Sequence, residues 1–297
     1  MRHFIVVYQF GKVASTSLVA TLNALPGVEA VQAHFLGRDN LKEMVDLIVD
    51  PGTSEYFHEH QVGQFVENAK TTRIINFYRQ GREAESDLSI ISLCRNPFNW
   101  FRSSIIQDMA GYLPVLQALH VGYEQDSVDD EVRTRQALGR VLVQFSEIIR
   151  DFGGIDELLD HPKGHNKALS EHPFFSGNRS LLAMFYMMLR PFSWFETHYR
   201  KAICYDVGDL PEIDQGVLFR GVGWASLFVL RYEDLEAHIK VAAERLRIGP
   251  IEQLVRENVS DRKEMFEPVR QAFASEPARV LQAQFAATKY SRRFGYS

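Results

Sequence analysis

A glycine–lysine pair followed by three hydroxyl residues lies near the N-terminus, in the segment VVYQFGKVASTSL. The apolar start of this segment predicts a short strand that ends before Gly11 and Lys12, and Ser15 begins a predicted helix. The first turn of a helix presents N–H groups and a partial positive charge, so it favours a phosphate or sulfate group. Gly11 allows the backbone to approach such an anion closely, and Lys12 adds a full positive charge. The predicted anion loop comprises Gly11, Lys12, Ala14, Ser15, Thr16 and Ser17.

The order of residues in this loop differs from the Walker loop of nucleotide-hydrolysing enzymes. That motif reads G-x-x-x-x-G-K-[ST], whereas here Gly11 and Lys12 come first and Val13 follows the lysine in place of a magnesium-binding hydroxyl. The sequence therefore predicts an anion held by lysine and hydroxyl groups, with no obligatory metal. The alternative is a plain strand–turn–helix in which Ser15 only caps the helix.

A second candidate anchor lies in the segment SIISLCRNPFNWFRSS. Arg95 ends an apolar strand, and Ser103 falls two turns into the helix that Pro97 is suited to begin. An arginine and a serine so placed can hold one phosphate from two sides, the arginine in a bidentate manner. The alternative is a surface arginine and a solvent-facing serine.

The elements that position these residues alternate between short apolar strands and helices. We predict strands at residues 3–8, 28–32, 88–93 and 227–230. We predict helices at residues 15–25, 41–49, from about 97 onward, 131–152 and 232–246. Such alternation is typical of an α/β fold with a parallel sheet, in which ligands bind at the carboxyl ends of the strands. Both predicted anchors directly follow a strand, as that rule requires.

The middle of the chain, about residues 107–223, shows helices and loops rather than obvious parallel strands. We expect a single domain over residues 1–297. Within it, the middle stretch is interpreted as a helical insertion that shapes the acceptor site.

Composition excludes several classes of protein. The 297-residue chain has a formal net charge of −5, which disfavours a protein that coats nucleic acid. No stretch approaches the roughly 20 apolar residues of a membrane span, and the N-terminus lacks a signal-peptide pattern. We therefore expect a soluble, cytoplasmic protein. Cys94 and Cys204 lie in apolar surroundings and are interpreted as small buried hydrophobic residues, with no zinc site.

The two loops in this order, with Lys12 in the first and Arg95 followed by Ser103 in the second, resemble the PAPS-dependent sulfotransferases. In that family the first loop binds the 5′-phosphosulfate of 3′-phosphoadenosine 5′-phosphosulfate (PAPS), and the second binds its 3′-phosphate. The segments WFETHYRKAICYDV, LFVLRYEDLE, ENVSDRKEMF and KYSRRFGYS, in this order, resemble bacterial sulfotransferase-like proteins of capsular polysaccharide synthesis. The resemblance implies a P-loop-like parallel sheet flanked by helices.

The resemblance also implies an activity. The protein would move a sulfuryl group from PAPS to an acceptor hydroxyl and release adenosine 3′,5′-bisphosphate, without a metal. A saccharide is the favoured acceptor, and a lipid alcohol, a small-molecule alcohol or an amine is the alternative. Because charge builds on the leaving oxygen, as in phosphoryl transfer, Lys12 would act by neutralising it.

An acceptor hydroxyl needs a general base, and histidine is the usual choice. His34 follows the second predicted strand, near the sheet edge that carries Lys12, and is the preferred candidate. His58 and His60, with Glu59 between them, are the next candidates, although their spacing is poor for a zinc site. The alternative for His34 is a purely structural histidine.

Two further pairs of charged residues have predicted roles, one in binding and one in helix capping. Arg262 and Lys263 are predicted to close over the 3′-phosphate as a basic loop, the alternative being a solvated turn. Glu233 and Asp234 lie at a predicted helix start, where acidic residues favour the helix dipole, and are interpreted as structural caps.

Two other functions compete with sulfuryl transfer. A P-loop kinase or NTPase predicts a Walker loop and a strand that ends in a magnesium-binding Asp, whereas the strand LFVL is followed by Arg231. A non-catalytic capsule-assembly protein on the same scaffold predicts little or no binding of the donor nucleotide.

Overall fold

The computed structural model describes residues 2–11, 13–49, 54–82, 86–118, 130–176, 178–255 and 266–297. The chain forms two compact units. The first, here called the sheet unit, comprises Met1–Arg95 and Trp194–Asn258. The second, here called the helical unit, comprises Asn96–Ser193 and Val259–Ser297.

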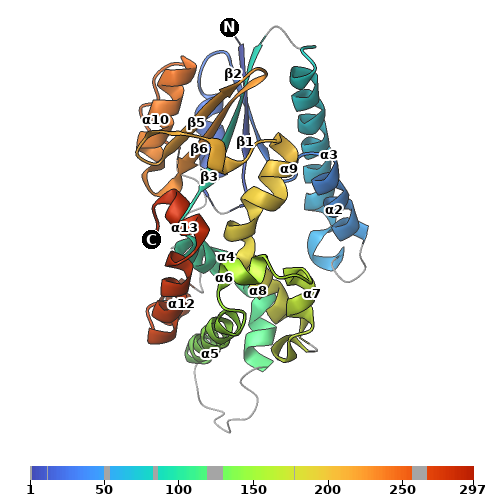
Figure 1. The fold of residues 1–297 in the computed structure, drawn as a ribbon, viewed down its shortest axis with the longest axis vertical. Helices are drawn as coiled ribbons and strands as arrows, with labels where there is room; N and C mark the ends of the chain where they lie inside the picture. The colour runs from blue at the N-terminus through green and yellow to red at the C-terminus, as the bar shows by residue number, and fades with distance from the viewer. Residues whose placement is uncertain are drawn as a thin grey trace. The chain divides into compact units, whose positions relative to one another are not determined.

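The described part of the sheet unit contains a six-stranded sheet in the order β2-β1-β3-β6-β5-β4 (Figure 1). The strands are β1 (Arg2–Tyr8), β2 (Val28–Ala33), β3 (Ser86–Cys94), β4 (Glu212–Asp214), β5 (Val217–Val222) and β6 (Ala225–Arg231). β1 pairs in parallel with both β2 and β3, and β3 pairs in parallel with β6. β5 and β4 are added in antiparallel orientation at one edge.

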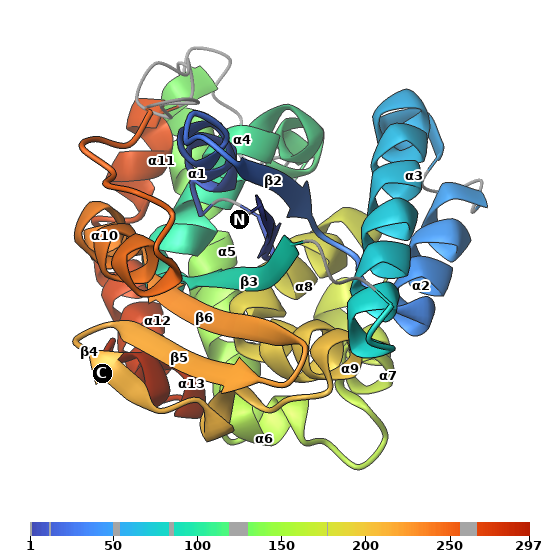
Figure 2. The ribbon, with the colours of Figure 1, turned by 90° about the horizontal axis from the view of Figure 1, so that it is seen from above.

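The central strands are nearly continuous apolar runs because both of their faces are covered. Residues 3–8 of β1 and residues 88–94 of β3 are buried, as is typical of strands inside a parallel sheet. One face of the sheet carries α1 and α10, and the other carries α2, α3 and α9 (Figure 2). These helices are α1 (Ser15–Asn23), α2 (Arg38–Val49), α3 (Ser54–Arg79), α9 (Arg200–Ile203) and α10 (Leu235–Leu246).

The strand order creates a switch point beside β1. The chain passes from β1 to β2 on one side and then returns across β1 to reach β3 on the other side. At such a point the connections that leave neighbouring strands diverge, and a crevice opens outside their carboxyl ends. A ligand is therefore expected to bind beside the residues that directly follow β1 and β3.

The described helical unit is built around an aromatic core. Phe145 of α5 contacts Phe185 of α8, with ring centroids 4.8 Å apart. Phe192 contacts Phe285 of α12 at 5.1 Å. The helices are α4 (Pro97–Ala118), α5 (Asp130–Asp151), α6 (Ile155–Leu159), α7 (His165–Ser170), α8 (Arg179–Trp194, whose last residue belongs to the sheet unit), α11 (Phe266–Ala272), α12 (Glu276–Ala286) and α13 (Lys289–Phe294).

The described residues also form short helical turns between the longer helices and strands. Two of them, η1 (Pro173–Phe175) and η3 (Val207–Asp209), are 3-10 turns. The turn η4 (Tyr232–Asp234) is also 3-10, so the helix predicted at residues 232–246 begins properly only at Leu235. The turn η2 (Phe195–Tyr199) is a π-helix, which is rare in proteins.

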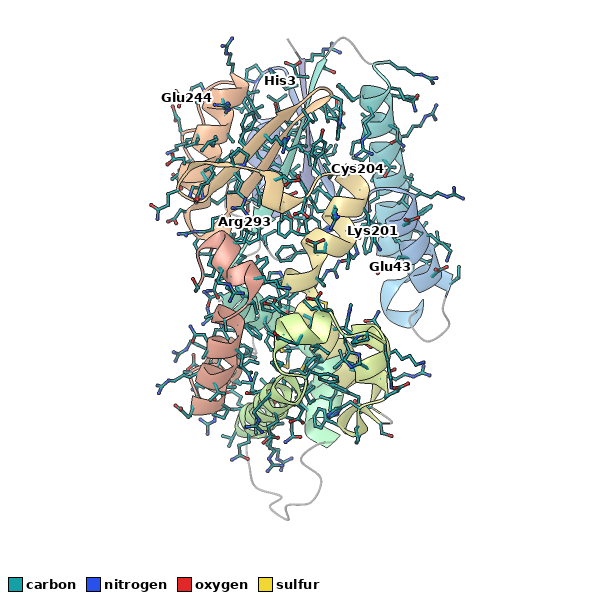
Figure 3. The ribbon with its side chains drawn as sticks, viewed as in Figure 1. His3, Glu43, Lys201, Cys204, Glu244 and Arg293 are labelled. Atoms are coloured by element: carbon teal, nitrogen blue, oxygen red, sulfur yellow. The ribbon has the colours of Figure 1, made fainter. Side chains whose placement is uncertain are left out.

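The predicted α/β class is confirmed, as are the strands and helices expected from apolar patterning. The four predicted strands pair in parallel as expected, whereas β5 and β4 extend the sheet in antiparallel orientation. The prediction missed α3, because its 26 residues mix polar and apolar side chains without a clear apolar stripe. It also missed β4, which has only three residues, and β5, whose apolar run is interrupted by Arg220 and Gly221. The prediction that Cys204 is buried was wrong, because its side chain is exposed beside the C-terminal end of α9 (Figure 3), whereas Cys94 is buried as expected.

No helix among the described residues combines the length and the apolar character needed to cross a membrane.

Tyr199 gives a test of the sheet-unit core. Its side chain is fully buried against Tyr8, Trp194 and Phe195. Its hydroxyl has no hydrogen-bond partner within the described parts of the chain. Burial raises the pKa of this phenol above its ordinary value of 10.0.

We expect Tyr199→Phe to raise the free energy of unfolding by about 1 kcal/mol at neutral pH, because an unsatisfied buried hydroxyl is removed. In the wild type, the unfolded phenol ionises near its ordinary pKa while the folded one stays protonated, so stability falls as the pH rises above about 10. The variant should lose less stability over that range. Denaturant titrations from neutral to alkaline pH measure both effects, with Tyr205→Phe as the control. A destabilised variant with an unchanged alkaline slope would contradict this account.

Candidate functional site

The connection between β1 and α1 contains two left-handed residues. Gly11 has φ of +96° and Ala14 has φ of +56°. A Cβ at Gly11 would meet nothing within 4 Å, so its backbone angle rather than space favours glycine there. Ala14 accepts a conformation that is costly for a residue with a Cβ, which indicates that the surrounding structure imposes it. Lys12 lies outside the described residues.

Helix α1 begins without a side-chain cap. The capping position is occupied by Ala14, whose methyl group offers no acceptor to the N–H groups of the first turn. The alternative in which Ser15 caps the helix is therefore wrong: Ser15 is already the first helical residue. A helix start without a capping side chain suits an external anion, because the N–H groups and the helix dipole both point toward it.

The three hydroxyl residues of the loop occupy different environments. Ser15 and Ser17 are each only 5% exposed, whereas Thr16 is exposed. The Ser15 hydroxyl oxygen accepts a hydrogen bond of 3.0 Å from Nε2 of Gln9. Ser15 is thus held by the protein, while Thr16 is directly accessible to a ligand.

Gln9, the first residue after β1, connects the anion loop to the neighbouring strand end. Its side chain is fully buried. Its Oε1 accepts a hydrogen bond from the backbone N–H of Gly11. Its Nε2 donates to Ser15 and lies 3.2 Å from Nδ1 of His34. One amide therefore contacts both the anion loop and the candidate base.

His34 lies where the sequence predicted it, directly after the carboxyl end of β2. Its Nδ1 is 3.2 Å from the carbonyl oxygen of Gln9, and its Nε2 is 2.9 Å from Nε2 of Gln32. Its backbone N–H donates to Oδ1 of the buried Asn68 of α3 at 3.0 Å. The position beside the β1 end is confirmed, while the role as a base stays a prediction.

Arg95 directly follows β3, the strand that pairs with β1. Its guanidinium carbon lies 4.3 Å from the ring centroid of Tyr232. Cys94 lies opposite Arg231, the last residue of β6, in the parallel register. Arg231 in turn donates to the carboxylate of Asp234 at 2.9 Å. Arg95, which follows β3, and Arg231, which ends the neighbouring strand β6, therefore both lie at the carboxyl edge of the sheet.

The acidic residues after β6 have a different role from the one predicted. Asp234 occupies the position before α10, yet its side chain makes no capping hydrogen bond and pairs with Arg231 instead. The interpretation of Asp234 as a helix cap was therefore wrong. Its carboxylate orients a cationic side chain at the sheet edge.

The remaining predicted site residues belong to the helical unit or have side chains outside the described part of the chain. Ser103 is half-buried in α4 of the helical unit, two turns from the start at Pro97, as expected. Arg262 and Lys263 lie outside the described residues. The backbones of His58, Glu59 and His60 belong to α3, but their side chains lie outside the description.

A histidine–carboxylate pair at the π-turn η2 was not predicted from the sequence. Nε2 of His198 is 3.7 Å from Oε2 of Glu43 on α2, and its Nδ1 is 2.8 Å from the hydroxyl of Thr197. The His198 ring lies 5.8 Å from the ring of Phe35, the residue after His34. Glu43 is labelled on α2 in Figure 3. A five-residue π-turn has no recognisable sequence pattern, so this pair was not anticipated.

The described residues contain no group of three or more His, Cys, Asp or Glu side chains arranged to hold a metal ion. The polar groups described at this edge of the sheet include the start of α1, the side chains of Arg95 and Arg231, and three amide side chains around His34. Cations and N–H donors of this kind bind an oxyanion, and a histidine next to them can accept a proton.

No family model, curated protein or solved structure matches the chain.

Ser15 and Thr16, two of the three hydroxyl residues of the loop, provide a matched pair of substitutions. Ser15→Ala removes the acceptor of the buried Gln9 amide and should lower the free energy of unfolding by about 1–3 kcal/mol. Thr16→Ala, one residue away and exposed, should change it by less than about 0.5 kcal/mol. Urea unfolding of both variants measures the difference. Equal effects would show that the Gln9–Ser15 hydrogen bond does not hold the loop.

Proposed function

We propose that the protein is a PAPS-dependent sulfotransferase that transfers a sulfuryl group to an acceptor hydroxyl. One observation carries the proposal: helix α1 starts without a side-chain cap directly after β1, and β1 is paired in parallel with the strand that leads into Arg95. This arrangement provides two anion-binding features at adjoining strand ends, which suits a donor with phosphates at both ends of a nucleoside.

The residues present fit the donor. The first turn of α1, with Gly11 and Thr16 on the approach to it, would bind the 5′-phosphosulfate. Arg95 would bind the 3′-phosphate through charge-assisted hydrogen bonds, while its stacking on Tyr232 limits the positions of the guanidinium. The sequence resemblance adds Lys12 to the first site and adds Ser103, Arg262 and Lys263 to the second.

The chain's own groups would act on the reaction in two ways. Lys12 and the N–H groups of α1 would stabilise the negative charge that develops on the leaving phosphate oxygen. His34 would accept the proton of the acceptor hydroxyl as the new S–O bond forms. The donor supplies the activated sulfuryl group. A saccharide hydroxyl is the acceptor that the resemblance favours.

The end of β6 argues against the kinase or NTPase alternative. That class needs an acidic residue after a neighbouring strand to hold magnesium. Here β6 ends in Arg231, and the nearby Asp234 is paired with that arginine at 2.9 Å. A cation at this point supports an anionic ligand bound without a metal.

Calorimetric titration with adenosine 3′,5′-bisphosphate, in the absence of magnesium, tests the proposal. The wild type should bind, and Arg95→Ala should bind about tenfold to a hundredfold more weakly, the loss expected for a charge-assisted hydrogen bond. Arg245→Ala is the matched control, because Arg245 also stacks on an aromatic ring of the sheet unit, 4.1 Å from the centroid of Phe219. The affinity of the Arg245→Ala variant for the bisphosphate should equal that of the wild type.

Two outcomes would contradict the proposal. Magnesium-dependent binding of ADP without binding of the bisphosphate would support the kinase alternative. Binding of neither nucleotide would support a non-catalytic scaffold.

A further inference from the structure

His34 is surrounded by amide side chains from three different elements. Gln9 follows β1, Gln32 lies near the end of β2, and Asn68 belongs to α3. Asn68 accepts hydrogen bonds from the backbone N–H groups of His34 and Phe35, at 3.0 and 3.3 Å, and so fixes the backbone. The two glutamines contact the imidazole itself, one at each ring nitrogen.

The orientation of Gln9 is fixed by its other partners. Its Oε1 accepts the N–H of Gly11, so its Nε2 must point toward Ser15 and His34. Nδ1 of His34 therefore faces two groups of Gln9 at 3.2 Å, the Nε2 donor and the backbone carbonyl acceptor, so the contacts with Gln9 suit either tautomer.

Gln32 determines the state of the other nitrogen. Its Nε2 is a donor and lies 2.9 Å from Nε2 of His34. Two N–H donors cannot bond to each other, so Nε2 of His34 must accept through its lone pair. A neutral imidazole whose Nε2 accepts in this way carries its proton on Nδ1, where it donates to the carbonyl of Gln9, while Nε2 of Gln9 donates to Ser15.

We infer that Gln32 covers the basic nitrogen of His34 in the free protein and that an acceptor hydroxyl displaces the Gln32 amide to reach it. Gln32 is then a positioning residue: it holds His34 in the tautomer that a general base needs and keeps the lone pair covered until the acceptor binds. The part of this inference that concerns the acceptor rests on the proposed sulfotransferase function.

The proton transfer that this implies is balanced. The acceptor O–H proton moves to Nε2 of His34, the acceptor oxygen forms a bond to sulfur, and the bond from sulfur to the phosphate oxygen breaks. His34 becomes an imidazolium with a proton on each nitrogen. Its Nδ1–H remains bonded to the carbonyl of Gln9, which stabilises the charge formed.

Nuclear magnetic resonance of the protein labelled with ¹⁵N-histidine tests the tautomer without any ligand. The chain contains 10 histidines, and the His34 signal is identified by its loss in His34→Asn. At a mildly alkaline pH we expect the wild-type proton on Nδ1. The near-isosteric Gln32→Glu replaces the donor by a carboxylate acceptor, so it should draw a proton onto Nε2.

Carbethoxylation by diethyl pyrocarbonate tests whether the lone pair is covered. Gln32→Met removes the donor while keeping the length of the side chain, so His34 should be modified about tenfold faster, the factor that corresponds to one hydrogen bond. Gln144→Met, at another half-buried glutamine in the helical unit, should leave the rate at His34 unchanged. Peptide mass spectrometry measures modification at His34 specifically.

A wild-type His34 protonated on Nε2 would overturn the inference. So would an unchanged modification rate in Gln32→Met, or a Gln32→Glu variant whose His34 keeps its proton on Nδ1 alone. These measurements need no nucleotide, so their failure is distinguishable from a failure to bind adenosine 3′,5′-bisphosphate, which would concern the donor and not the state of His34.

Discussion

The parallel pairing of β1 with β2 on one side and β3 on the other is the constraint on which the candidate site depends. Register and strand direction bring the carboxyl ends of the three strands to the same edge of the sheet. The residues that follow these strands, Gln9, His34 and Arg95, are separated in sequence but lie at this same edge of the sheet. The pairing itself is stabilised by apolar runs buried on both faces, so the site rests on a core that tolerates little movement.

The buried amide of Gln9 links the end of β1 to the loop that follows it and to His34. A fully buried amide is costly unless its donors and acceptor are bonded, and here they are bonded to the anion loop and directed at the histidine. The same contacts that stabilise the fold therefore also fix the loop and the imidazole. A polar network of this kind specifies a single arrangement more strictly than apolar packing does.

Elements with a clear apolar periodicity could be predicted from the sequence. Features that depend on contacts between segments distant in the sequence could not. The strands β1 and β3 are recognisable as nearly continuous apolar runs, and β2 as a shorter, partly apolar one. The positions of Arg95 and His34 followed from the ends of β3 and β2 respectively. The alternative in which Ser15 caps helix α1 failed because Ala14 occupies the capping position. Ala14 adopts a left-handed conformation usually taken by glycine, which the conformational preference of alanine does not predict. Gln9 and Gln32 appear in sequence as ordinary polar residues, and only the paired strands reveal that they converge on one imidazole.

The central claim is that this edge of the sheet binds a nucleotide with a phosphate at each end. A crystal structure of the protein grown with adenosine 3′,5′-bisphosphate tests it most directly. The account predicts the 5′-phosphate against the backbone of the loop between β1 and α1, and the 3′-phosphate within hydrogen-bonding distance of the Arg95 guanidinium. A nucleotide bound away from the ends of β1 and β3 would contradict it. So would a nucleotide bound there with the Arg95 guanidinium in contact with neither phosphate.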